Sequence, residues 1–189
     1  MARDERPPAA YAPYEIRNVL AFIGLGWKER ALTLLDRFVA DQRPPGWRQW
    51  PEVSWHDPRA PRFLGDLPHG WVASTFVRTV RRMIAWERAD GALVVGAGVP
   101  EAWVREAPGL RVHGLATHHG PLGLTMRADG DGCVRVVFTA GLRPPGGIVL
   151  SSPSPRPLRS VHVDGRPQAV AHADRVRLAA APAEVVLLY

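Results

Sequence analysis

Cysteine and long apolar runs are the two features that this sequence lacks most clearly. Cys133 is its one cysteine, so the chain can form no internal disulfide, and cysteine usage does not indicate a compartment. No stretch reaches the roughly 18 apolar residues that a membrane-spanning helix requires, and the first residues lack the apolar core of a signal peptide. We therefore expect no membrane partner. We expect a cytoplasmic location if Met1 is the true start, and the location is otherwise unknown.

Lysine is equally scarce, because Lys28 is the only one in the chain. Arginine therefore supplies nearly all of the positive charge behind the formal net charge of +6 and the pI of 10.6. This bias is typical of a GC-rich coding sequence rather than of selection for a basic surface. The basic residues are spread along the chain, and no known nucleic-acid motif accompanies them. We expect no nucleic-acid partner.

Three familiar site signatures are absent as well. The segment GAGVPEAW at residues 96–103 contains glycines but does not match the G-x-G-x-x-G pattern of dinucleotide-binding proteins. No serine lies in a nucleophile elbow. The histidines do not follow the His-Glu-x-x-His spacing of zinc enzymes, and a single cysteine offers no second soft ligand. The sequence therefore predicts no cofactor and no metal site.

What is present begins with helical patterning in the first half. Residues 1–12 are charged and rich in proline, and we expect them to be frayed. Apolar residues then recur at helical spacing from about Tyr14 to Gly24, and again over residues 27–42. Because only a short glycine-containing connection joins these two segments, they should form an antiparallel helix hairpin. A third helix is predicted over residues 68–88.

The pattern changes from helical to extended near residue 90. Eight short runs that are β-branched or alternate in polarity follow, separated by turn residues. They occupy residues 92–99, 110–117, 122–128, 133–139, 147–152, 159–165, 175–181 and 184–189. Residues 100–109 should insert a single helical turn. The predicted fold class is α+β, with a helical segment over residues 1–90 and an antiparallel β-sandwich or barrel over residues 91–189.

A long loop separates the second and third helices and carries the most distinctive composition. Between Arg43 and Trp71 it holds four tryptophans, two histidines and three carboxylates. Loops of this length are uncommon in compact domains and are usually functional or disordered, and disordered segments are poor in aromatic residues. Indole rings can cover the C–H faces of a sugar, while carboxylates accept hydrogen bonds from its hydroxyl groups. The loop therefore favours a carbohydrate ligand.

Four segments carry a resemblance to a known class of enzyme. They read APYEIRNV (12–19), LGWKERALTLLDRFVADQRPPGWRQWPEV (25–53), RFLGDLPHGWVASTFVRTV (62–80) and ALVVGAGVPEAW (92–103). In this order they resemble the C-terminal end of bacterial (α/α)6-barrel glycoside hydrolases, some of which carry discoidin-type sugar-binding modules. The chain is more distantly similar to inverting α-L-rhamnosidases, in which a Trp-Glu element precedes a late barrel helix. Trp50 and Glu52 match that element, with Pro51 inserted between them.

The resemblance implies an incomplete enzyme in which Glu52 is the general base. The sequence supplies only three of the helices that a full toroid requires. Inverting hydrolysis needs an acid and a base about 6.5–9.5 Å apart, and the acid would come from an earlier part of the barrel. We therefore expect a C-terminal fragment that is inactive alone and whose partner is the missing N-terminal part of the barrel.

Seven residues of the loop region are the predicted site. Glu52 and Asp66 are the candidate catalytic residues. The candidate sugar-binding residues are Trp47, Trp50, Trp55, His69 and Trp71. Each has a structural alternative: Glu52 suits an exposed loop glutamate, Asp66 a helix N-cap, His69 and Trp71 packing at a hinge, and the other tryptophans a plug against the sandwich.

Two functional hypotheses remain open at this point. In the first, the chain is part of a glycoside hydrolase, and the helix hairpin should expose an apolar face where the missing helices dock. In the second, the chain is a non-catalytic carbohydrate-binding or interaction module that folds by itself. The two hypotheses differ in whether the helix hairpin exposes an apolar face to which further helices would dock.

Overall fold

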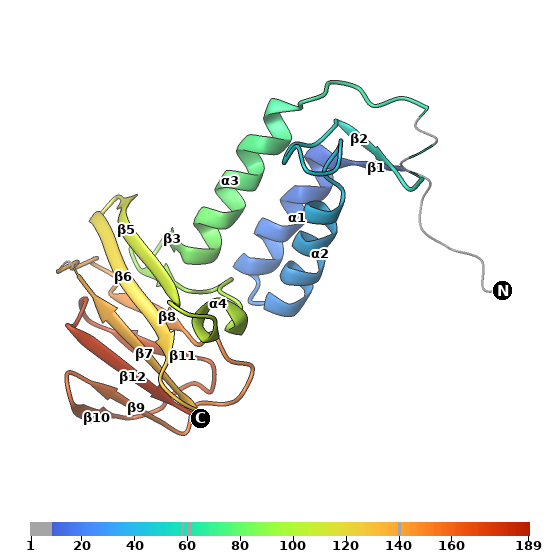
Figure 1. Ribbon diagram of the computed structural model, residues 1–189. Helices are drawn as coiled ribbons and strands as arrows, with labels where there is room; N and C mark the ends of the chain where they lie inside the picture. The colour runs from blue at the N-terminus through green and yellow to red at the C-terminus, as the bar shows by residue number, and fades with distance from the viewer. Residues whose placement is uncertain (1–8, 58, 60–61, 140) are drawn as a thin grey trace. The chain divides into compact units, whose positions relative to one another are not determined.

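The computed structural model describes residues 9–57, 59, 62–139 and 141–189. Over these residues the chain is mixed α+β, with four helices and three sheets (Figure 1). It divides into two compact units, one up to Arg82 and one from Met83 to Tyr189, here named the helical unit and the sheet unit. No helix in the described ranges is long and apolar enough to cross a membrane.

The helical unit begins with the predicted helix hairpin. α1 spans Ala12–Gly24 and α2 spans Lys28–Ala40. Their buried residues recur every three or four positions, which gives each helix one apolar stripe, and the two stripes pack against each other. The chain reverses between them at Gly26, whose φ of 76° lies in the left-handed region that glycine adopts without strain.

α3 spans Gly70–Ile84, which is shorter than predicted at both ends. Its first turn lies near the first turn of α1, because the Tyr14 and Trp71 rings are 5.6 Å apart. Its last turn lies near the end of α1, where a Cβ added at Gly24 would be 2.7 Å from Nη2 of Arg82. α1 and α3 therefore run parallel and side by side, as Figure 1 shows.

A small two-stranded sheet lies at the end of this unit where α1 begins. β1 (Ala9–Tyr11) pairs antiparallel with β2 (Val53–Trp55), so that Tyr11 lies opposite Val53. The prediction that residues 1–12 are frayed is therefore wrong for residues 9–12, and residues 1–8 lie outside the described residues. The pairing links the start of the chain to the middle of the long loop, which is a contact between positions far apart in sequence.

The sheet unit contains a six-stranded and a four-stranded sheet. In spatial order the larger sheet comprises β10 (Arg166–Gln168), β9 (Ser160–Val163), β12 (Glu184–Leu188), β7 (Cys133–Phe138), β6 (Gly120–Ala128) and β5 (Leu110–Thr117). The smaller comprises β11 (Arg175–Leu178), β8 (Ile148–Ser151), β4 (Leu93–Val95) and β3 (Ala85–Glu87). The short helix α4 (Glu101–Arg105) is the predicted helical turn.

Alternate side chains of both sheets fill one apolar core. Leu122, Leu124 and Met126 of β6 are buried in the same cluster as Ile148 and Leu150 of β8. Because successive side chains of a strand point to opposite faces, this alternation places one face of each sheet toward the other in a sandwich-like arrangement.

Each of the eight predicted strand segments contains a strand, and two further strands of the sheet unit, β3 and β10, were not predicted. β3 lies where the third helix was expected to continue, because Ala85–Glu87 pairs with β4 instead. β10 is a three-residue strand that contains Pro167. The sheets are also not wholly antiparallel, since β4 and β8 run parallel.

Candidate functional site

The candidate site lies in the helical unit, where the long loop meets β1 and the first turns of α1 and α3. Its central residue is Glu52, which directly precedes β2. The backbone of Glu52 is held on both sides: its N–H donates to the Asp66 carbonyl at 3.0 Å, and its own carbonyl accepts from the Ala12 N–H at 3.0 Å. The position of this residue is therefore fixed by main-chain contacts with two distant segments.

The Glu52 carboxylate accepts two hydrogen bonds. The Tyr11 hydroxyl donates to Oε1 at 2.6 Å, and the Asp66 N–H donates to Oε2 at a longer 3.4 Å. The Tyr11 hydrogen bond, followed by that from the Asp66 amide, lowers the pKa of Glu52 from its ordinary value of 4.5. The same bond raises the pKa of Tyr11. Glu52 is consequently an ionised carboxylate at neutral pH, which suits a base or a hydrogen-bond acceptor but not a general acid.

Gly65 allows the loop to approach Glu52 closely. Its φ of 64° lies in the left-handed region, and a Cβ added there would lie 2.7 Å from the Cβ of Glu52. No larger side chain fits at this position without displacing one of the two segments. Glycine is therefore required for the Asp66 amide to reach the carboxylate.

Asp66 and His69 complete a compact group of three titratable side chains. Ligand atoms of Glu52, Asp66 and His69 all lie within 4.8 Å of one another. The main chain of His69 is positioned by its backbone N–H, which donates to the Trp50 carbonyl at 2.9 Å. Among the described residues, its buried Nδ1 has no hydrogen-bond partner. The sequence spacing of these three residues resembles no known motif, so only the folded loop reveals the group.

The structure does not support the alternative role of Asp66 as a helix N-cap. α3 begins at Gly70, and the first hydrogen bond of its opening turn runs from the Ala73 N–H to the His69 carbonyl at 3.2 Å. Asp66 lies four residues before the helix, and its side chain is exposed on the loop. It belongs to the group around Glu52 rather than to the helix.

Exposed aromatic rings border this group on one side. The rings of Tyr11 and Tyr14 stack with centroids 4.9 Å apart, and Tyr14 meets Trp71 edge to face. The His69 ring lies 6.3 Å from that of Trp71. The guanidinium of Arg17 lies 4.6 Å from the Trp71 ring centroid, as in a cation–π contact. The exposed fractions are 37% for Tyr11, 54% for Tyr14 and 41% for Trp71, so ring surface is accessible beside the carboxylates.

Sequence reasoning missed Tyr11, Tyr14 and Arg17. Tyr11 reaches Glu52 because β1 pairs with β2, whereas Tyr14 and Arg17 reach Trp71 because α1 runs beside α3. One signal was present in the sequence: Tyr14 and Arg17 lie three residues apart and so share one side of the predicted first helix.

Trp50 is a core residue, which corrects its prediction as a sugar-stacking side chain. It is 4% exposed, and its Nε1–H donates to the Phe38 carbonyl at 2.5 Å. Its ring centroid lies 4.7 Å from that of Phe76 on α3. No face of the indole is accessible to a ligand, and the residue instead joins the loop to α2 and α3.

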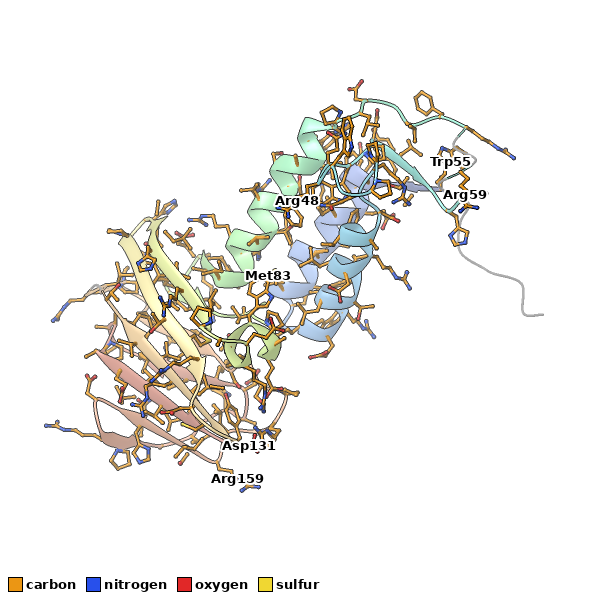
Figure 2. The ribbon with its side chains drawn as sticks, viewed as in Figure 1. Arg48, Trp55, Arg59, Met83, Asp131 and Arg159 are labelled. Atoms are coloured by element: carbon orange, nitrogen blue, oxygen red, sulfur yellow. The ribbon has the colours of Figure 1, made fainter. Side chains whose placement is uncertain are left out.

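Among the described residues, the other two tryptophans make no hydrogen bond or ring contact with the group around Glu52. Trp47 is 70% exposed. Trp55 is half-buried and its Nε1–H donates to the Phe63 carbonyl. Figure 2 shows Trp55 and Arg59 at the far end of β2, away from Arg48 on the preceding loop. Trp55 lines a separate pocket of about 230 Å³ whose other walls are Arg43, Pro44, Pro45, Ser54, Leu64 and Leu67.

The predicted site residues therefore fall into three groups. Glu52, Asp66, His69 and Trp71 come together, Trp47 and Trp55 lie elsewhere on the loop, and Trp50 is buried. Comparison with protein-family models, with curated proteins and with solved structures gives no match.

Proposed function

We propose that this chain is the C-terminal part of a carbohydrate-active enzyme of the glycoside hydrolase type, and that the group around Glu52 is its share of the sugar cleft. The observation that carries this proposal is an ionised carboxylate with two donors fixed on it, bordered by accessible aromatic rings. Sugars are bound by this combination, because ring faces cover C–H groups while carboxylates accept hydrogen bonds from hydroxyl groups.

Within that cleft Glu52 acts as the base or as a hydroxyl acceptor. The partner that protonates the leaving group lies outside this group of residues. Asp66 is too close for that role in an inverting enzyme, because its carboxylate comes within 4.8 Å of Glu52, whereas the inverting pair stands about 6.5–9.5 Å apart. The chain by itself therefore binds sugar without hydrolysing it.

The directions of its three helices support the proposal that the helical unit closes an (α/α)6 barrel. α1, α2 and α3 alternate in direction, as successive helices of such a barrel must. Leu25, Trp27 and Val39 of the hairpin are large apolar residues that are 47–61% exposed. They lie at the two ends of the hairpin rather than along one continuous face, which differs from the expected docking stripe.

The alternative function is a non-catalytic carbohydrate-binding or interaction module. It rests on the same accessible rings and carboxylate, which need no second catalytic group to bind a sugar. The two functions differ in the association state that they predict for the isolated chain. A fragment of a barrel should self-associate, whereas a stand-alone module should be a monodisperse monomer that unfolds cooperatively.

A sugar-binding titration tests what both functions share. The chain is titrated with a panel of neutral and acidic oligosaccharides in EDTA, with tryptophan fluorescence and calorimetry as readouts. We expect at least one glycan to bind, and Trp71→Ala to weaken it about tenfold or more because an aromatic contact is lost. Trp47→Ala is the matched control, since Trp47 is exposed but lies outside the group.

Two results would contradict the proposal. One is a folded chain that binds no glycan in the panel. The other is binding that Trp47→Ala abolishes and Trp71→Ala leaves unchanged. Trp50→Ala is not an informative variant, because removing a buried indole destabilises the fold by about 3–5 kcal/mol and would abolish binding indirectly.

A further inference from the structure

Glu52, Asp66 and His69 form a mixed set of oxygen and nitrogen donors from two separate parts of the loop. Their ligand atoms lie within 4.8 Å of one another. A cation bound at about 2.0–2.2 Å from each ligand would need ligand atoms roughly 3–4 Å apart. A small rotation of the side chains would therefore bring these atoms to coordination distance. Asp66 is exposed, so its side chain can move without disturbing the core.

His69 supplies a second and independent observation. Its Nδ1 is buried and has no hydrogen-bond partner among the described residues. An unpaired buried polar atom costs roughly 1–3 kcal/mol, so such atoms are uncommon in folded proteins, and a bound ion or water is a frequent reason for one. The backbone N–H of His69 donates to the Trp50 carbonyl at 2.9 Å, which fixes the position of its main chain beside the two carboxylates.

The carboxylates retain free acceptor positions. Each oxygen of Glu52 accepts one hydrogen bond, from Tyr11 or from the Asp66 amide, and so keeps a second lone pair. Within the described chain the side-chain oxygens of Asp66 take part in no hydrogen bond and no ion pair. The Tyr11 hydroxyl and the Asp66 backbone amide orient the Glu52 carboxylate, and metal-binding carboxylates are commonly oriented by such hydrogen bonds.

We propose that Glu52, Asp66 and His69 bind one divalent transition-metal ion, with Zn²⁺ as the ion that this donor set fits best. One imidazole with two carboxylates favours zinc over Mg²⁺ or Ca²⁺, which take oxygen ligands alone. Three protein ligands leave at least one coordination position open to water or to a ligand hydroxyl group. The site does not depend on the proposed sugar function, since the ion binds in the absence of any sugar.

Calorimetric titration with Zn²⁺ alone tests this inference on the whole chain after treatment with EDTA. We expect one ion per chain, with much weaker binding of Mg²⁺ and Ca²⁺. Asp66→Asn and His69→Ala should each weaken Zn²⁺ binding about tenfold or more. The matched controls are Asp57→Asn, an aspartate of the same loop, and His113→Ala, an exposed histidine of β5, which should leave the affinity unchanged.

The variants keep the test decisive even if one of them folds poorly. Asp66 is exposed, so Asp66→Asn should melt like the unchanged chain in EDTA even where His69→Ala does not. The inference is overturned if Zn²⁺ does not bind to the folded chain, or if Asp66→Asn binds it as tightly as the unchanged chain. Because sugar is titrated in EDTA and zinc without sugar, failure of one proposal leaves the other standing.

Discussion

The two units differ in where their large apolar side chains lie. Ten large apolar residues of the described chain are more than a third exposed, and all ten belong to the helical unit. They are Tyr11, Tyr14, Leu25, Trp27, Val39, Trp47, Phe63, Leu67, Trp71 and Val77. In the sheet unit the corresponding side chains are buried or half-buried, most of them in one shared core.

This difference follows from the architecture of each unit. Two sheets can cover each other's apolar faces, so the sheet unit completes its core without help. Three helices and a long loop leave ten large apolar side chains exposed, and exposed apolar patches often mark binding surfaces. The helical unit is therefore where a ligand, or further chain, is expected to bind.

The largest expected effect comes from separating the two units. Residues 83–189 expressed alone should unfold cooperatively in urea, because their core lies within the unit. Residues 1–82 alone should aggregate or lack a cooperative transition. The measurement is circular dichroism against urea concentration together with size-exclusion chromatography. A monodisperse, cooperatively unfolding fragment 1–82 would contradict the comparison.

The same substitution in each unit gives the next largest difference. Leu150→Ala in β8 removes a side chain that is 0% exposed, and should cost about 2–5 kcal/mol of unfolding free energy. Leu25→Ala, at a residue that is 61% exposed at the end of α1, should change it by less than about 0.5 kcal/mol. Urea unfolding of both variants checks this. Equal losses would mean that Leu25 is covered in solution.

Most of the fold was accessible from the sequence because local patterns decide most of its elements. The alternating residues of β6 and β7 predicted strands, and the stripes of α1 and α2 predicted a hairpin. The missed strands β1, β2, β3 and β10 are three residues long, which is too short to show a period. They form only because a partner strand lies beside them: β1 and β2 pair across more than 40 residues, whereas β3 and β10 pair with the strands next to them in sequence, β4 and β9.

The residues of the candidate site could be chosen from the sequence only in part, because some of their contacts join positions far apart in the chain. Glu52, Asp66, His69 and Trp71 could be chosen from composition, because they cluster within one loop. Tyr11 could not, because its contact with Glu52 spans 41 residues and depends on the pairing of β1 with β2. Trp50 was misassigned because an indole in a loop gives no sign of whether it faces solvent or the core.

A pair of glycine substitutions tests how tightly the loop is held at the site. Gly65 and Gly46 both have left-handed φ values, so alanine at either should cost about 1–2 kcal/mol. Only at Gly65 would the new Cβ meet Glu52, which should add about 1–3 kcal/mol. Gly46→Ala meets nothing within 4 Å and is the matched control. Urea unfolding measures both, and equal losses would mean that the loop shifts freely around Glu52.

The smallest expected effect concerns the hydrogen bond between Tyr11 and Glu52. Because the folded-state pKa of Glu52 is lowered, the unfolded chain binds its proton first as the pH falls. The resulting stabilisation is complete above the unfolded pKa near 4.5 and is lost as the pH falls through the lower folded value. Tyr11→Phe removes the main cause of that shift, so the pKa of Glu52 should rise toward its ordinary value and acid unfolding should become less steep below pH 4.5.

The control for this effect is Tyr14→Phe, because Tyr14 stacks on Tyr11 but makes no hydrogen bond to Glu52 in the described chain. NMR titration of the Glu52 carboxyl carbon in EDTA reports the pKa directly, and urea unfolding between pH 3 and pH 7 reports the stability. A Tyr11→Phe chain with an unchanged Glu52 pKa would show that the Tyr11 hydroxyl is not the main cause of the lowered pKa. Equal shifts of the Glu52 pKa in both variants would instead indicate that the stacked tyrosine rings, rather than the Tyr11 hydroxyl alone, lower this pKa.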